Sequence, residues 1–294
     1  MFVQVALCAS EPQLMATSSV DKSVMLWSLA DYSVLFKSTH RGAGSCRSVC
    51  LAEDLVYSGW DDGKVRAHAV PTGELVWTLE AHSTPACNVT RSHGGHFLVT
   101  ACEAGECRVW DLHTRGLVSV FKGHGGPVTA LEVFDGDEAV LSSSRDRTLA
   151  AWDVRSGSRL AGFQTRMGGV TGAVLGADQV QVVSVGQDRR LTFWDLREPH
   201  AVQSVPDAHA EEPTCLCMSP DGSLLASGGK DMVVRVWEFA TGKLLSEVMA
   251  HSDTISSVKF GFDNCTLVTA SSDGSVALWK VVGRTLAPAS QKVS

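Results

Sequence analysis

The sequence predicts an all-β fold made of seven similar four-stranded units, and three observations support this prediction. Of the 294 residues, 44% are hydrophobic and 19% are charged, enough apolar material for a sizeable core. The 27 glycines and the β-branched run at residues 179–184 favour strands and turns over helices. Most of the tryptophans recur at a nearly constant interval, which is typical of a repeat protein.

The tryptophan positions divide the chain into seven units. Six of the eight tryptophans lie at 27, 110, 152, 194, 237 and 279, with gaps of 83, 42, 42, 43 and 42 residues. The first gap is a double interval, and His68 stands near its midpoint where another unit has tryptophan. We therefore expect a single domain over residues 1–294, with units at about 1–40, 41–82, 83–124, 125–166, 167–209, 210–251 and 252–294.

Three further columns keep fixed offsets from the tryptophan column. A hydroxyl residue precedes it by ten positions: Thr17, Ser58, Thr100, Ser142, Ser184, Ser227 and Thr269. An aspartate precedes it by six positions in six units, and the third unit has alanine: Asp21, Asp62, Ala104, Asp146, Asp188, Asp231 and Asp273. Units two to seven also have a residue 22 positions before the aspartate column: His40, His82, His124, Arg166, His209 and His251.

Each unit has the pattern of four short strands. In the fourth unit, residues 128–134, 139–143, 148–154 and 160–164 are predicted strands, separated by turn residues. The first strand of unit one begins at Phe2, so the last strand of unit seven has to come from residues 286–293. Pro288 has no backbone donor there, which only an edge strand tolerates.

The repeated residues resemble WD40 repeats over essentially the whole chain. Gly123-His124 matches the Gly-His element of that family, and Trp110-Asp111, Trp152-Asp153 and Trp194-Asp195 match its Trp-Asp dipeptide. The resemblance implies a seven-bladed β-propeller in which histidine, hydroxyl, aspartate and tryptophan form a hydrogen-bonded structural tetrad. The complete sets would be His124/Ser142/Asp146/Trp152, His209/Ser227/Asp231/Trp237 and His251/Thr269/Asp273/Trp279. Units one, two, three and five each lack a member, and we expect their loops to be less rigid.

Composition excludes several functional classes. The net charge of −7 and the isoelectric point near 5.8 argue against nucleic-acid binding, and no apolar run is long enough for a membrane helix. Nine scattered cysteines and the absence of a signal-peptide pattern predict free thiols in the cytoplasm. Cytoskeletal, ciliary and nuclear locations stay open.

Catalysis, cofactors and metals are not expected. Histidine, serine and aspartate are the residue types of a hydrolase triad, but an enzyme has no use for several copies of one. The Cys215/Cys217 pair and the His93/His96 pair have no further ligands at metal-site spacing. The glycine-rich segments do not match a phosphate-binding loop.

Binding of protein or peptide partners in a multiprotein complex is the predicted function. The residues just before the aspartate column are expected to be exposed on the loop-bearing face: Val20, Asp61, Glu103, Arg145, Gln187, Lys230 and Ser272. Trp60 flanks Asp61 and is a further candidate, because an exposed tryptophan among arginines and carboxylates is typical of interface hot spots. The alternative is that these are solvated turn residues and that Trp60 packs against a neighbouring residue.

Two alternatives remain. Arg155 and Arg197 each complete a Trp-Asp-x-Arg motif, at 152–155 and 194–197. The pair resembles the motif by which WD40 substrate receptors dock on the adaptor of cullin-4 ubiquitin ligases. The second alternative is a structural component of cilia or microtubules.

Overall fold

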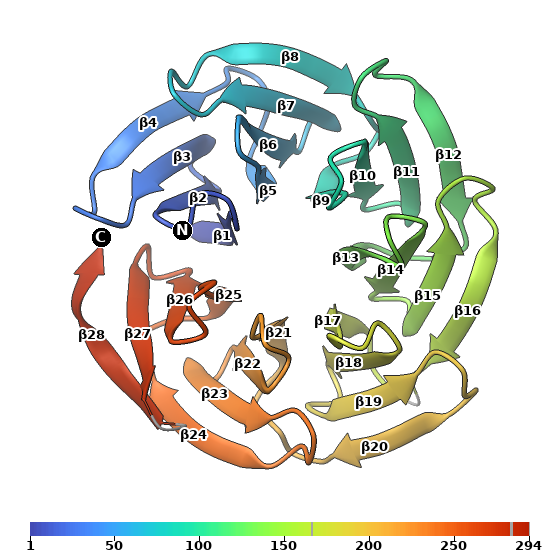
Figure 1. The fold of residues 1–294 in the computed structure, drawn as a ribbon, viewed down its shortest axis with the longest axis vertical. Coiled ribbons are helices and arrows are strands. Elements are labelled where there is room, and N and C mark those ends of the chain that lie inside the picture. The colour runs from blue at the N-terminus through green and yellow to red at the C-terminus, as the bar shows by residue number, and fades with distance from the viewer. Residues whose placement is uncertain (166, 283–284, 294) are drawn as a thin grey trace. The chain divides into compact units, whose positions relative to one another are not determined.

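The computed structural model describes residues 1–165, 167–282 and 285–293, and every regular element in them is a β-strand (Figure 1). The strands form seven four-stranded antiparallel sheets, and in each sheet neighbouring strands follow one another in chain order. The fold is thus the predicted all-β, seven-bladed propeller. No helix in the described residues is long and apolar enough to cross a membrane.

The sheets are numbered one to seven in chain order. Sheet one contains β1 (Phe2–Leu7), β2 (Leu14–Ser19), β3 (Ser23–Ser28) and β4 (Val34–Thr39). Sheet two contains β5 (Cys46–Leu51), β6 (Leu55–Trp60), β7 (Lys64–Ala69) and β8 (Leu75–Glu80). Sheet three contains β9 (Ala86–Arg91), β10 (Phe97–Cys102), β11 (Glu106–Asp111) and β12 (Leu117–Lys122). Sheet four contains β13 (Val128–Phe134), β14 (Ala139–Ser144), β15 (Thr148–Asp153) and β16 (Arg159–Gln164).

The remaining three sheets repeat this arrangement. Sheet five contains β17 (Val170–Leu175), β18 (Gln181–Gly186), β19 (Leu191–Asp195) and β20 (Ala201–Val205). Sheet six contains β21 (Pro213–Met218), β22 (Leu224–Gly229), β23 (Val233–Glu238) and β24 (Leu244–Met249). Sheet seven contains β25 (Ile255–Phe260), β26 (Thr266–Ser271), β27 (Val276–Val282) and β28 (Thr285–Val293).

The chain forms two compact units, Ala6–Arg166 and Met1–Val5 with Met167–Ser294. In the first unit β5 packs against β2 and β9, and β9 packs against β13. In the second unit β21 packs against β17 and β25. Within each unit, therefore, the first strand of a sheet packs against the preceding sheet: against its first strand in most pairs, and against the second strand of sheet one in the case of β5.

Apolar side chains fill the space between neighbouring sheets of a unit. Val109 of sheet three and Trp152 of sheet four belong to one buried cluster, and Val236 of sheet six and Leu267 of sheet seven belong to another. The second strands are almost wholly buried, whereas β4, β8, β16 and β20 are mostly exposed. The exposure of the fourth strands follows from their position at the edge of each sheet.

Side chains at the second position of the first strands also connect successive sheets. Cys87 Sγ donates to the carbonyl oxygen of Val128 (3.1 Å), and Thr171 Oγ1 donates to that of Pro213 (2.5 Å). Ser256 Oγ likewise donates to the carbonyl oxygen of Phe2 (2.9 Å). This bond places the start of β1 in the same compact unit as sheet seven.

The C-terminal strand is present as predicted. β28 pairs with β27, and Pro288 lies opposite Trp279 next to an irregularity in the register. β28 is the last strand of its sheet, where a residue without a backbone donor is tolerated. The backbone N–H of Leu286 donates to Ser246 Oγ of β24 (3.2 Å), so the tail also contacts sheet six.

Candidate functional site

The turns between the second and third strands hold the aspartate column, and in sheet four the structure brings all four predicted tetrad residues together. His124 Nε2 lies 2.7 Å from Ser142 Oγ, and Trp152 Nε1 donates to the same oxygen (2.8 Å). His124 Nδ1 lies 3.3 Å from the carboxylate of Asp146, which also accepts the backbone N–H of Gly125 (2.7 Å). The carboxylate thus ties the loop before β13 to the turn before β15.

Sheets six and seven repeat this geometry. His209 Nε2 is 2.7 Å from Ser227 Oγ and His251 Nε2 is 2.8 Å from Thr269 Oγ1. The indoles of Trp237 and Trp279 donate to those same hydroxyl oxygens at 2.9 and 3.1 Å, and the Nδ1 atoms of the two histidines lie 3.0 and 3.1 Å from Asp231 and Asp273.

The proton positions in these sets follow from chemistry. A carboxylate only accepts, so each histidine Nδ1 donates to it, and in a neutral imidazole Nε2 then accepts from the hydroxyl group. Burial raises the pKa of Asp231, but donors from His209 and Arg235 outweigh that effect and hold the pKa well below its usual range. Every member is paired, the condition under which a buried polar network fixes its surroundings.

Sheets one and five contain partial sets. Trp27 donates to Thr17 Oγ1 (2.9 Å) and Trp194 donates to Ser184 Oγ (2.8 Å). Asp188 is half-buried, and the carboxylate accepts the backbone N–H of Arg190 (3.2 Å). Burial raises the pKa of Asp188, in contrast to the aspartates of the complete sets. Arg166, which takes the histidine position of this unit, lies outside the described residues.

Sheet two departs from the expectation most. The side chain of Trp60 is fully buried (0% exposed), and its indole N–H donates to Ser58 Oγ (2.9 Å). The interpretation of Trp60 as an exposed interface residue is therefore wrong, and the alternative, in which it packs against its neighbours, is confirmed. Ser58 and Trp60 lie two residues apart on β6, so their side chains point to the same face and the indole reaches the hydroxyl group.

His40 and His68 contact each other instead of joining a tetrad. Their Nε2 atoms are 2.9 Å apart, and Ser38 Oγ lies 3.1 Å from that of His68. Burial, together with His40 and Arg66, lowers the pKa of His68 to about 4. Burial and Arg66 also lower the pKa of His40, so both imidazoles are neutral near pH 7 and one can donate to the other.

Sheet three has the histidine, the hydroxyl group and the tryptophan without the aspartate. His82 Nε2 lies 2.8 Å from Thr100 Oγ1, and Trp110 donates to the same oxygen (3.0 Å). Ala104 is exposed in the turn where the other sheets have aspartate. Burial, together with Arg108, lowers the pKa of His82 to about 4.

The predicted turn residues differ in exposure. Glu103, Arg145, Gln187 and Lys230 are exposed, as is Val20 at 41%, whereas Asp61 and Ser272 are half-buried. The carboxylate of Asp61 pairs with Arg47 (2.5 Å) and accepts the backbone N–H of Ser45 (2.8 Å). The amine of Lys230 pairs with Glu212 (2.6 Å).

Arg155 and Arg197 lie at the other ends of their sheets, in the turns after the third strands. Arg197 pairs with Asp195 (2.6 Å) and Arg155 is exposed. Asp153 instead accepts the backbone N–H of Ser156 (2.6 Å). In the two Trp-Asp-x-Arg motifs, therefore, the aspartate has different partners: the arginine side chain in one and a backbone N–H of the turn in the other.

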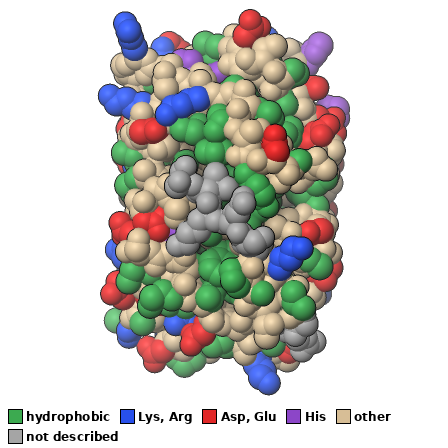
Figure 2. All heavy atoms as spheres, turned by 90° about the vertical axis from the view of Figure 1, so that its left-hand side faces the viewer, with side chains coloured by type: hydrophobic (Ala, Val, Ile, Leu, Met, Phe, Trp, Pro, Cys, Tyr) green, Lys and Arg blue, Asp and Glu red, His purple; other side chains and the backbone are tan. Residues whose placement is uncertain are grey.

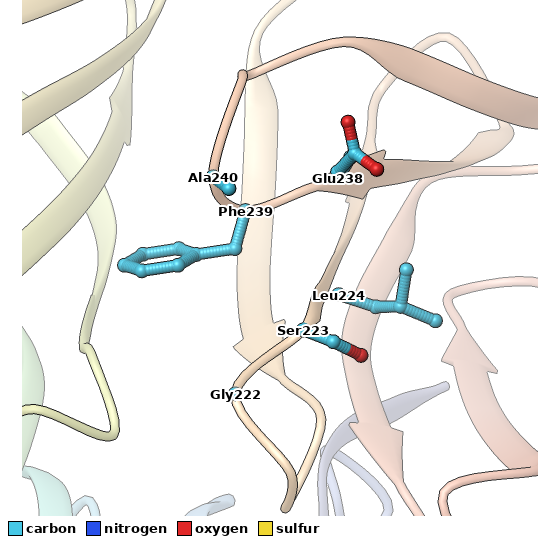
Figure 3. A pocket seen from close by; sticks show the side chains of 6 residues that line it. All are labelled: Gly222, Ser223, Leu224, Glu238, Phe239 and Ala240. Carbon is cyan, nitrogen blue, oxygen red and sulfur yellow. The ribbon is translucent and has the colours of Figure 1, made fainter.

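A shallow hollow of about 260 Å³ lies in sheet six, at the opposite end from Asp231. It is lined by Gly222, Ser223, Leu224, Glu238, Phe239 and Ala240. The side chains of Leu224, Glu238 and Phe239 point in different directions (Figure 3). The volume of the hollow is also smaller than that of typical small-molecule sites. Among the described residues, no three His, Cys, Asp or Glu side chains are grouped so as to hold a metal ion.

Sequence reasoning overlooked the side chains that connect first strands. Thr171, Thr214 and Ser256 form a column with intervals of 43 and 42 residues, close to those of the tryptophans. Thr214 donates to the carbonyl oxygen of Ile255. The column is hard to see because Val3, Arg47 and Cys87 occupy the same position in earlier units.

Comparison with known proteins identifies the repeat. The model of the WD domain, G-beta repeat (WD40) matches residues 73–111, 115–153, 201–238 and 242–280, more than half of the chain. Pre-rRNA-processing protein IPI3 of Mycosarcoma maydis is 36% identical over 81 residues, 28% of this chain and 14% of that protein. Periodic tryptophan protein 2 of Arabidopsis thaliana is 35% identical over 71 residues, 24% of this chain and 8% of that protein.

Nuclear distribution protein nudF of Aspergillus oryzae is 31% identical over 84 residues, 28% of this chain and 18% of that protein. The match thus spans less than a fifth of each of these three relatives.

Proposed function

Because the chain belongs to the WD40 family of repeat proteins, we propose that it is a non-catalytic scaffold that binds protein or peptide partners through the turns that follow the second strands. Proteins of this family typically serve as protein-interaction scaffolds, and function in such a fold depends on the side chains of its loops. The names of the relatives refer to different processes, so they do not single out a partner.

The hydrogen-bonded sets at these turns support the proposal. In sheets four, six and seven the carboxylate fixes both the turn and the loop that precedes the sheet, as at Asp146 and Gly125 (2.7 Å). A preorganised surface loses little conformational entropy when a partner binds. The tetrads are therefore proposed to be supports for a binding surface rather than reactive groups.

The side chains presented there suit a protein partner. Glu103 and Arg145 are oppositely charged and exposed, and Val20 adds an apolar side chain. Elsewhere, exposed hydrophobic side chains are interspersed with charged and polar ones (Figure 2), which is common on soluble protein surfaces. Varied chemistry on a fixed framework favours selective recognition of a polypeptide.

Site-specific photo-cross-linking tests this proposal. A benzoylphenylalanine introduced at Glu103 or Gln187, in the proposed binding turns, is expected to form cross-links to partner proteins in cells. The same residue at Glu74 or Lys243, exposed at the other ends of sheets two and six, is the matched control. Cross-links that form only from the control positions would refute the proposal.

The second candidate function is that of a substrate receptor of a cullin-4 ubiquitin ligase. Exposed Arg155 and the Arg197–Asp195 pair favour it, because a guanidinium group binds carboxylates in bidentate fashion. Co-purification of the ligase adaptor, lost in an Arg155→Ala/Arg197→Ala double variant with an unchanged melting temperature, is expected. No co-purification with the wild type would exclude this function.

A further inference from the structure

Sheet three has alanine at a position where each of the other six sheets has an aspartate. In the complete sets each aspartate accepts two hydrogen bonds from the preceding loop, one from the histidine Nδ1 and one from the backbone N–H of the next residue. The backbone donors are Gly125, Ala210 and Ser252, at 2.7, 3.1 and 3.1 Å from Asp146, Asp231 and Asp273. The side chain of Ala104 has no acceptor atom for the corresponding donors of sheet three, which are His82 Nδ1 and the backbone N–H of Ser83.

Both of those donors are in place in sheet three. His82 Nε2 lies 2.8 Å from Thr100 Oγ1, as in the complete sets, so its Nδ1 faces the turn that contains Ala104. Within the described part of the chain, neither this Nδ1 nor the backbone N–H of Ser83 has a hydrogen-bond partner. His82 is only 8% exposed, whereas Ser83 and Ala104 are open to solvent.

Arg108 provides a third donor. Arg66 and Arg235 occupy the same position in sheets two and six, and each pairs with the aspartate four residues earlier, at 2.6 and 2.7 Å. Arg108 has no such aspartate and donates to the carbonyl oxygen of Ala81 (2.7 Å) and to Glu106. Arg108 Nη2 makes no hydrogen bond to any of the described residues.

In the described part of the chain, neither Glu103 nor Glu106 accepts a hydrogen bond from His82 or Ser83. Glu106 pairs with Arg108 and with Lys122 (3.6 Å), and it makes no hydrogen bond to His82 among the described residues. Glu103 is exposed beside the gap. The site therefore combines one neutral imidazole N–H, one backbone N–H and one guanidinium group whose charge Glu106 partly offsets.

We propose that His82, Ser83 and Arg108 form a binding site for a carboxylate group, and that an aspartate or glutamate side chain of a bound polypeptide supplies it. The donors match those that hold Asp231 in sheet six, so the site is shaped for a carboxylate. Glu103 and Glu106 disfavour a doubly charged phosphate there. The polypeptide source rests on the proposed function, because a partner bound to these turns would hold its carboxylate at high effective concentration.

Nuclear magnetic resonance of the full chain tests the site with acetate as the probe. Acetate is expected to shift the Ser83 amide and His82 imidazole signals saturably, whereas acetamide and sodium chloride at equal concentration do not. Ala104→Asp fills the gap with the chain's own carboxylate and is expected to weaken acetate binding at least tenfold. Ala104→Ser, which adds no charge, is the control and keeps the response.

The site is refuted if the wild type shows no saturable shift, or if Ala104→Asp responds as the wild type does. Partner cross-linking from Gln187 then tests the source of the carboxylate. The yield of cross-linked partner is expected to fall at least fivefold in Ala104→Asp and to be unchanged in Ala104→Ser. An equal yield of cross-linked partner in both variants would exclude a partner carboxylate at this site. Absence of any partner would refute the proposed function, while the acetate titration still decides the site.

Discussion

Replacing Asp231 by alanine is expected to destabilise the protein far more than the same change at Asp188. Asp231 has a side chain only 6% exposed, and its carboxylate accepts from His209 (3.0 Å) and from Arg235 (2.7 Å). Asp188 is half-buried and accepts the backbone N–H of Arg190 (3.2 Å). The two changes remove the same atoms from the same position of the repeat, so the difference measures the hydrogen-bonded set.

The structure sets the magnitude. Without Asp231, the Nδ1 of His209 loses its acceptor, and an unsatisfied buried donor costs about 1–3 kcal/mol. Breaking a buried ion pair costs about 3–5 kcal/mol, but Arg235 keeps Glu247 as a partner at 3.0 Å. We expect a loss of about 3 kcal/mol for Asp231→Ala and less than about 1 kcal/mol for Asp188→Ala.

Thermal unfolding at a fixed scan rate measures this difference. At about 2 °C per kcal/mol for a chain of this size, the melting temperature should fall by about 6 °C for Asp231→Ala and by about 2 °C or less for Asp188→Ala. The fall in melting temperature for Asp231→Asn, whose amide oxygen still accepts from His209, should lie between those of the two alanine variants. Equal shifts for the two alanine variants would contradict the role assigned to the sets.

Three further predictions address other parts of the chain. The free energy of unfolding should fall as the pH drops from 6.5 to about 4, because the low pKa values of His68 and His82 mean that the unfolded chain binds more protons in that window. Urea titrations should show a smaller fall for His68→Phe than for the wild type. An unchanged pH profile in that variant would contradict the assigned role of His68. Deleting residues 286–294 should lower the melting temperature by more than 5 °C, because β28 covers the edge of β27, and a drop of less than 2 °C would show that the tail does not complete sheet seven. Maleimide should label exposed Cys265 first, whereas burial raises the pKa of the Cys217 thiol to about 12, and mass spectrometry of peptides would show a different order if this is wrong.

Much of the fold follows from the period of the sequence. In sheet four the observed strands differ from the predicted ones by one residue at most, because turn residues separate runs with a regular apolar pattern. The register of the other units also predicts the last strand, despite Pro288. A repeat gives seven independent readings of one unit, so a single irregular copy does not obscure the others.

The departures come from side chains that replace missing members of a column. In sheet two the tryptophan column falls on His68. The sequence alone does not reveal that Trp60 takes over the missing indole donor and bonds to Ser58. The contact between His40 and His68 joins the loop after β4 to β7, and its geometry depends on how that loop packs against sheet two. The exposure of Ala104 and the orientation of Arg108 likewise required the structure.

Hydrogen exchange of the chain alone and in complex with its cross-linked partners tests the central proposal most directly. We expect slower exchange of the turn amides at residues 103–105 and 187–190 in the complex, with unchanged exchange at residues 154–158 and 196–200, at the other ends of their sheets. Protection confined to 154–158 and 196–200 would contradict the proposed binding turns and favour the ligase-receptor function.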